Sequence, residues 1–99
     1  MQIGDALNGL DELAPGIRGY TIEIGNDVYV PFVESLEPGK GHFRAYLDTL
    51  KAMGRTIKFP TVISVRLRNI LEVAGFELIW EWSKDFQELV DVWRWPPAG

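Results

Sequence analysis

The chain contains no cysteine and a single histidine, His42, among its 99 residues. Without cysteine there is no disulfide framework, no thiolate zinc site and no cysteine nucleophile. One histidine and scattered carboxylates make a poor set of metal ligands, so we expect no metal. No apolar run approaches the ~20 residues that a membrane span needs. The first residues also lack the basic and apolar segments of a signal peptide. We therefore expect a cytoplasmic protein with no membrane partner.

Clustered positive charge is also missing. The formal net charge is −4, and the lysines and arginines are scattered rather than interleaved with aromatic residues. A nucleic-acid interface needs concentrated positive charge, so we expect no nucleic-acid partner. The hydrophobic share of 46% and the charged share of 24% are typical of a globular protein. A length of 99 residues indicates one domain, residues 1–99.

The first third of the chain predicts a short helix and a strand hairpin. Residues 3–13 carry apolar side chains at helical spacing and predict an amphipathic helix, which the following Pro-Gly pair ends. Ile17–Ile24 alternates as a strand does, and Gly25-Asn26-Asp27 predicts a turn into an antiparallel strand over residues 28–34. Pro31 lies inside that second strand, where it indicates an edge, a bulge or a stop in pairing.

A glycine-bearing loop follows and leads into a helix. Gly39 and Gly41 lie in the loop, residues 43–53 repeat apolar side chains at helical spacing, and Gly54 is placed for a left-handed stop. The first N–H groups of a helix have no partner within it, and the helix dipole adds positive charge there, which suits a phosphate. A tight strand-to-helix turn without ligand is the alternative, and these residues alone favour neither. The loop lacks the Gly-Lys-Ser/Thr ending of a nucleoside-triphosphate P-loop.

The second half of the chain predicts a strand, a helix and a second hairpin. Residues 56–59 form a strand parallel to residues 28–34, because a helix connects the two. Ser64 is placed to cap a helix that closes at Gly75. Residues 76–95 alternate as two antiparallel strands do. The predicted fold class is α/β (α+β): a mixed sheet in the order β-β-α-β-α-β-β, with a parallel central pair and a short N-terminal helix.

Four tryptophans lie in the predicted hairpin, as one same-face pair on each strand. Trp80 and Trp82 belong to the first strand, and Trp93 and Trp95 belong to the second. Such pairs allow cross-strand aromatic packing, as part of the core or as cover for a sheet edge. An interface with a second subunit is the alternative, so a homodimer stays open.

This order of elements resembles the C-terminal two-thirds of the GCN5-related N-acetyltransferase (GNAT) family, over about residues 17–97. The phosphate loop of that family has Arg or Gln, two residues, Gly, one residue, and then Gly or Ala. Residues 36–41, Leu-Glu-Pro-Gly-Lys-Gly, carry both glycines but place Leu36 at the basic or amide position. The resemblance implies that the acetyl-CoA pyrophosphate is held by backbone N–H groups of Gly39, Lys40, Gly41 and His42.

The helix that ends in Gly75-Phe76 carries a second part of the resemblance. The family pattern starts there with Asn and has a Tyr shortly before its Gly-Phe end. Ser64 falls at the Asn position and Leu71 at the Tyr position. Ser64 would hydrogen-bond a pantetheine amide. The tyrosine is the usual general acid in the family, and Leu71 cannot protonate a leaving thiolate.

The same resemblance offers a reason for Pro31. In the family the strand before the loop bulges and splays from its parallel neighbour, which opens a slot for pantetheine. A proline that interrupts pairing is compatible with such a slot. Backbone groups of Phe32 and Val33 would then face the cofactor.

A transferase of this kind also needs a base that takes a proton from the amine. Among the carboxylates near the predicted slot, Glu34 is the candidate, because it lies between the strand and the loop. A solvated carboxylate at a strand end is the alternative for Glu34, as it is for Glu23 and Glu37. His42 at the helix start is either held neutral by the dipole or assists phosphate binding when charged.

Two functions are therefore compatible with the sequence. The first is a small acyl-CoA-dependent N-acetyltransferase that transfers an acetyl group from acetyl-CoA to an unknown amine or protein acceptor. The second is a catalytically inactive module of the same fold that acts as a binding or inhibitor protein. The glycine loop favours the first, whereas Leu36 and Leu71 favour the second. Very short members of the family occur in bacteriophage genomes, which suggests a phage source.

Overall fold

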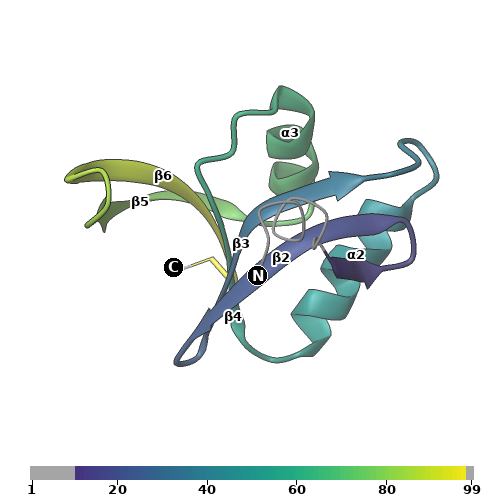
Figure 1. The fold of residues 1–99 in the computed structure, drawn as a ribbon, viewed down its shortest axis with the longest axis horizontal. Helices are drawn as coiled ribbons and strands as arrows, with labels where there is room; N and C mark the ends of the chain where they lie inside the picture. Colours follow the sequence, from purple (N-terminus) through teal and green to yellow (C-terminus); the bar gives the residue numbers. More distant parts are fainter. Residues whose placement is uncertain (1–10, 98–99) are drawn as a thin grey trace, which may run out of the picture.

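The computed structural model describes residues 11–97, which form a mixed α+β fold with a six-stranded sheet and two helices (Figure 1). The strands lie in the order β1-β2-β3-β4-β6-β5. In chain order the elements are β1 (Asp11–Ala14), β2 (Ile17–Ile24), β3 (Asp27–Ser35), α2 (His42–Ala52), β4 (Thr56–Pro60), α3 (Val65–Val73), β5 (Glu77–Ser83) and β6 (Glu88–Trp95). No helix in this part of the chain has the length and apolar character to cross a membrane.

The start of the described chain differs from the sequence-based prediction. Asp11–Ala14 is a strand, β1, that pairs antiparallel with β2, so the helix predicted over residues 3–13 is wrong at its C-terminal end. The rest of that predicted helix lies outside the described residues. A positive φ of 74° at Gly16 lets the chain reverse into β2, and pairing with β2 satisfies backbone groups that a helix end would leave free.

The predicted hairpin of β2 and β3 is confirmed, and it contains an irregularity at Pro31. Tyr20 lies opposite Phe32, but Ile22 lies opposite Tyr29, so β3 carries one extra residue between these pairs. This register shift is the interruption that proline predicts in a strand. A Cβ at Gly19 would lie 2.1 Å from the Phe32 carbonyl oxygen, so only glycine allows β2 to approach the bulged backbone this closely.

The predicted parallel pair of β3 and β4 is also confirmed, but it is short. Residues 27–29 of β3 pair with residues 56–58 of β4, and no further pairs follow. β3 continues to Ser35, so its last six residues, from Val30 on, run without β4 beside them. The two strands therefore part immediately after Tyr29, next to the bulge.

Both helices cover the same face of the sheet and begin and end near the predicted positions. The Ser64 hydroxyl caps α3 by accepting a hydrogen bond from the Leu67 N–H at 3.2 Å, as predicted. Gly54 and Gly75 follow the two helices with positive φ, as the stop signals predicted. Leu47 of α2 and Leu71 of α3 belong to one core cluster with residues of the sheet. That cluster consists of Ile17, Val28, Val30, Tyr46, Leu47, Leu50, Ile57, Phe59, Val62, Leu71, Phe76 and Trp93.

The hairpin of β5 and β6 is confirmed, and Figure 1 shows that it extends away from both helices. Its tryptophans do not face one another across the strands, because Trp80 lies opposite Asp91 and Trp82 lies opposite Leu89. The two strands use their tryptophans differently. Trp93 on β6 is buried in the core, whereas Trp80 and Trp82 on β5 are exposed.

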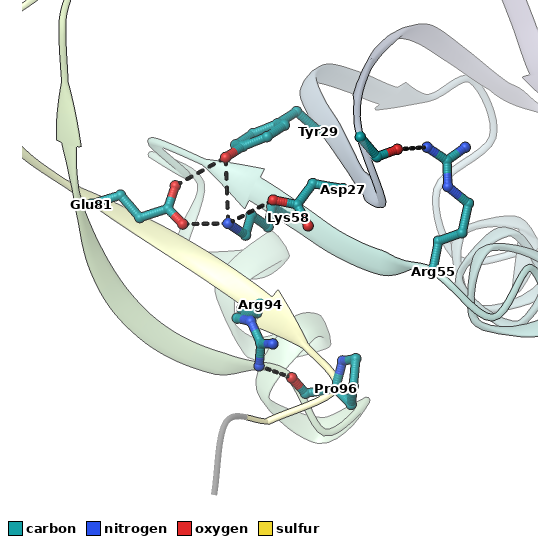
Figure 2. Close-up of polar contacts among 8 residues, drawn as sticks. Asp27, Tyr29, Arg55, Lys58, Glu81, Arg94 and Pro96 are labelled. Atoms are coloured by element: carbon teal, nitrogen blue, oxygen red, sulfur yellow. Dashed lines mark hydrogen bonds and ion pairs between the residues drawn. The ribbon is translucent and has the colours of Figure 1, made fainter.

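A polar cluster on the sheet face opposite the helices ties this hairpin to the centre of the sheet (Figure 2). The Lys58 ammonium on β4 contacts Asp27 at 3.2 Å, the Tyr29 hydroxyl at 3.3 Å and the Glu81 carboxylate of β5 at 2.5 Å. Burial lowers the pKa of Lys58, but the bonds with Glu81, Asp27 and Tyr29 outweigh burial and raise it above its ordinary value. The lysine is thus held charged in a largely buried place, with all its donors satisfied.

Candidate functional site

A cavity of about 630 Å³ lies beside the end of β3, in the part of the strand that runs without β4 as a partner. Three segments line it: the end of β3, the glycine loop with the first turn of α2, and the first turns of α3. The two helices therefore direct their N-termini at the same hollow. Its volume is within the range of about 300–1,000 Å³ that small-molecule sites occupy.

The mouth of α2 carries unpartnered donors toward this hollow. Gly41 is the N-cap residue with a φ of 79°, and no described side chain caps the helix. The N–H groups of the first turn have no acceptor within a helix, and the helix dipole places partial positive charge on them. Gly39 also has a positive φ, and a Cβ at either glycine would meet nothing within 4 Å. The loop is therefore open, and its glycines are required by backbone conformation rather than by crowding.

Two arginines add full positive charge to the same wall. Arg44 lies in the first turn of α2 and Arg66 in the first turn of α3, and both line the cavity. Neither guanidinium has a carboxylate partner among residues 11–97. Both are thus available to an anionic group placed between the helix ends.

Apolar side chains form the deeper wall. Phe43 of α2, Leu67 and Ile70 of α3, and Val33 of β3 line the cavity and pack against the core cluster. The site therefore has a cationic, donor-rich rim and an apolar interior. This combination suits an elongated ligand with an anionic end and a less polar body.

His42 is held at the edge of the loop. Its Nε2 lies 3.6 Å from the Glu37 carboxylate, and its ring packs against Gly16, where an added Cβ would lie 2.5 Å from Cδ2. The imidazole therefore lines the cavity beside the helix mouth and is fixed by the turn between β1 and β2. Any side chain in place of the hydrogen of Gly16 would displace the imidazole of His42.

Glu34 lines the cavity from the end of β3. Its carboxylate forms an ion pair of 3.4 Å with Arg18 on β2, and both side chains are about half exposed. An exposed pair of this kind holds its partners only weakly. Glu34 alternates with Val33 along β3, so its side chain lies on the same sheet face as Phe32 and Arg18, and its role as the base stays a prediction.

Most of the residues that the sequence singled out come together here. Val33, Glu34, Gly39, Gly41, His42 and Ser64 line the cavity. Phe32 and Lys40 do not line it. The Phe32 side chain is 42% exposed and lies opposite Tyr20, on the sheet face away from the helices. The backbone role expected for Phe32 stays a prediction.

The residues that sequence reasoning missed are the two arginines and the apolar wall of α3. Arg66 follows the predicted cap Ser64 by two residues, so the sequence does indicate that it lies in a first helical turn. Nothing local, however, indicates that α3 begins beside α2, because that contact depends on where β4 leads the chain. Leu71, which the resemblance sets at the position of a tyrosine, is fully buried in the core with 0% exposure.

The described residues contain no group of three or more His, Cys, Asp or Glu side chains that could hold a metal ion. Comparisons with known proteins add no family to this geometry: no protein-family model, no curated protein and no solved structure matches the chain.

Proposed function

We propose that the chain binds acetyl-CoA in this cavity and acts as a small N-acetyltransferase on an amine acceptor. The observation that carries the proposal is the uncapped N-terminus of α2, which opens on a cavity beside the end of β3, beyond the bulge and beyond the last pair with β4. The resemblance of the glycine loop and of the Ser64 helix to the GNAT family implies a ligand with this shape and charge.

The phosphates of the ligand would lie at the helix mouth. A diphosphate there accepts hydrogen bonds from the first-turn N–H groups after Gly41, and Arg44 and Arg66 neutralise the charge that remains. The pantetheine arm would continue along Val33 and Leu67, beside the free edge of β3. Backbone groups of β3 that have no strand partner would bond its amides.

The transfer itself would use Glu34. The amine nitrogen attacks the thioester carbonyl, the carbon–nitrogen bond forms and the carbon–sulfur bond breaks. The proton of the amine passes to the Glu34 carboxylate, and the leaving thiolate takes a proton from water. Leu71 supplies none, because it carries no hydroxyl and lies in the core.

A binding module without catalysis is the second candidate function. The burial of Leu71 favours it, because the usual general acid is replaced by a side chain that the core requires. In this case acetyl-CoA or CoA would bind without turnover. Release of free thiol from acetyl-CoA, measured with a panel of amines, separates the two functions.

Thermal unfolding with acetyl-CoA tests the binding that both functions share. Ligand at ~100 times its Kd adds about 2.7 kcal/mol to stability, which in a domain of this size raises Tm by roughly 10–20 °C. Gly41→Asp should abolish the shift, because its carboxylate would occupy the phosphate position.

Gly54→Asp is the matched control for that variant. Gly54 follows the same helix at its other end, has a similar positive φ of 71° and has equally open space around an added Cβ. It should keep the ligand-induced shift. If the wild type shows no shift, or if Gly41→Asp keeps the shift in full, the proposed site is wrong.

A further inference from the structure

The two edges of the described sheet are built in opposite ways. β1, at one edge, has four residues and an irregular register between Glu12 and Ala14. β5, at the other edge, has seven residues that pair with β6 without any irregularity. Short and bulged strands protect a sheet edge from pairing with another chain, whereas a long, regular strand offers its free backbone groups. Only the β5 edge lacks this protection.

The side chains of β5 divide sharply between the two sheet faces. Leu78, Trp80 and Trp82 lie on one face and are 44%, 62% and 59% exposed. The other face carries Ile79 between Glu77 and Glu81. Glu81 is committed to Lys58 in its own chain. The strand thus joins an unprotected backbone edge to an exposed aromatic surface, which soluble proteins rarely leave uncovered.

We propose that β5 pairs antiparallel with β5 of a second copy of this chain, around a two-fold axis at Trp80. In this register Trp80 lies opposite its own copy, and Leu78 lies opposite the partner copy's Trp82. All seven residues of the strand then find partners, and the two aromatic faces join into one continuous surface. Aromatic pairs at directly opposite positions stabilise neighbouring strands.

The acidic residues select this register among its neighbours. A shift of two residues in one direction would place Glu77 opposite Glu81 of the second copy. A shift of two in the other direction would place Glu81 opposite Glu81. Like charges directly opposite destabilise strand pairing. In the Trp80-centred register, Glu81 lies opposite Ile79 and Glu77 lies opposite Ser83, so no carboxylates oppose each other. A second copy in this register therefore matches the apolar pattern of the edge and keeps its carboxylates apart.

Sedimentation velocity of the full chain over a range of concentrations tests the proposal. We expect a monomer–dimer equilibrium in the wild type, and Trp80→Glu should shift it to monomer by placing two carboxylates across the axis. Trp80 is exposed in the single chain, so this variant should fold normally, which circular dichroism verifies. Val73→Glu, at an exposed apolar position on α3, is the matched control and should leave the dimer unchanged.

A charge-swap experiment tests the register. Trp80→Lys alone should also be monomeric, whereas an equimolar mixture of Trp80→Glu and Trp80→Lys should recover the dimer, because opposite charges then meet across the axis. A wild type that is monomeric throughout overturns the proposal, as does a dimer that survives Trp80→Glu. Failure of the mixture to dimerise overturns the Trp80-centred pairing. None of these outcomes depends on acetyl-CoA.

Discussion

The cavity end of this molecule and its projecting hairpin use the same sheet in opposite ways. At the cavity, β3 continues without β4 after three pairs, and backbone donors, arginines and glycines line the hollow beside its end. In the hairpin, β5 and β6 keep seven consecutive pairs, and the exposed groups are aromatic side chains. Broken pairing exposes main-chain polar groups that suit a charged small molecule, whereas unbroken pairing presents a regular edge that suits another strand. The following experiments perturb one region at a time.

The largest effect is expected where the two regions share a core. Phe59 is 1% exposed and contacts the rings of Phe43 at 6.1 Å and Phe76 at 5.5 Å between centroids. Phe59→Ala should cost about 3–5 kcal/mol of unfolding free energy, since it leaves a cavity beneath both helices. Urea denaturation measures this loss. A loss below about 1 kcal/mol would contradict the burial of Phe59 in the common core.

Alkaline pH should act on the cavity side through Tyr46. Tyr46 lies on the buried side of α2, and this burial raises its pKa to about 12 from an ordinary 10.0. The folded state thus keeps this proton longer than the unfolded state. The stabilisation is complete below pH 10, and it is lost as pH rises toward 12. Tyr46→Phe should remove about 2–3 kcal/mol of this pH dependence. Identical alkaline unfolding curves for the two proteins would contradict the burial.

Removing the charge of Lys58 should destabilise the hairpin, because Lys58 bonds Glu81 of β5. Lys58→Met keeps the apolar stem but leaves the Glu81 and Asp27 carboxylates without their cation. We expect a loss of about 2 kcal/mol, less than for a fully buried pair, because both carboxylates are partly exposed. Amide hydrogen exchange should quicken in β5 while α2 keeps its protection.

The matched control for this variant is Arg55→Met, which removes an ion pair with the exposed Glu23 and should cost at most about 1 kcal/mol.

The pKa of Lys58 is raised above 10.5, so its contribution is complete below that pH and is lost as pH rises through the folded pKa. The two stability curves, wild type and Lys58→Met, should therefore converge in strong alkali. Equal losses of protection in α2 and β5 would mean that the hairpin has no separate anchor.

The smallest effect is expected at the cavity rim. Arg66→Gln should weaken acetyl-CoA binding by about 5- to 10-fold, since an exposed charge-assisted hydrogen bond contributes about 1 kcal/mol. Lys84→Gln, at the tip of the hairpin, removes the same charge far from the cavity and should leave affinity unchanged. Isothermal titration calorimetry distinguishes the two. Equal weakening by both variants would indicate a general charge effect instead of a contact.

Local signals predicted much of this fold. The turn at Gly25, the cap at Ser64 and the stops at Gly54 and Gly75 act through backbone conformations that a few neighbouring residues determine, and the structure has each of them. The bulge at Pro31 was predictable for the same reason, because proline cannot donate to a ladder.

Features that depend on distant contacts could not be predicted. Asp11–Ala14 forms a strand because β2 lies beside it, although the apolar side chains of residues 3–13 are spaced as in a helix. Arg66 joins the cavity because β4 carries α3 to the mouth of α2. The separate environments of Trp80 and Trp93 depend on how far the hairpin extends beyond the helices, which no spacing in the sequence encodes.

Amide chemical shifts on titration with acetyl-CoA test the central claim most directly. A ¹⁵N-labelled sample should show its largest changes at the N–H groups of Gly41, His42, Phe43 and Arg44, with the Trp80 and Trp82 indoles unmoved. That result would place the anionic ligand at the mouth of α2. Changes confined to the hairpin, or no changes at saturating ligand, would contradict the account.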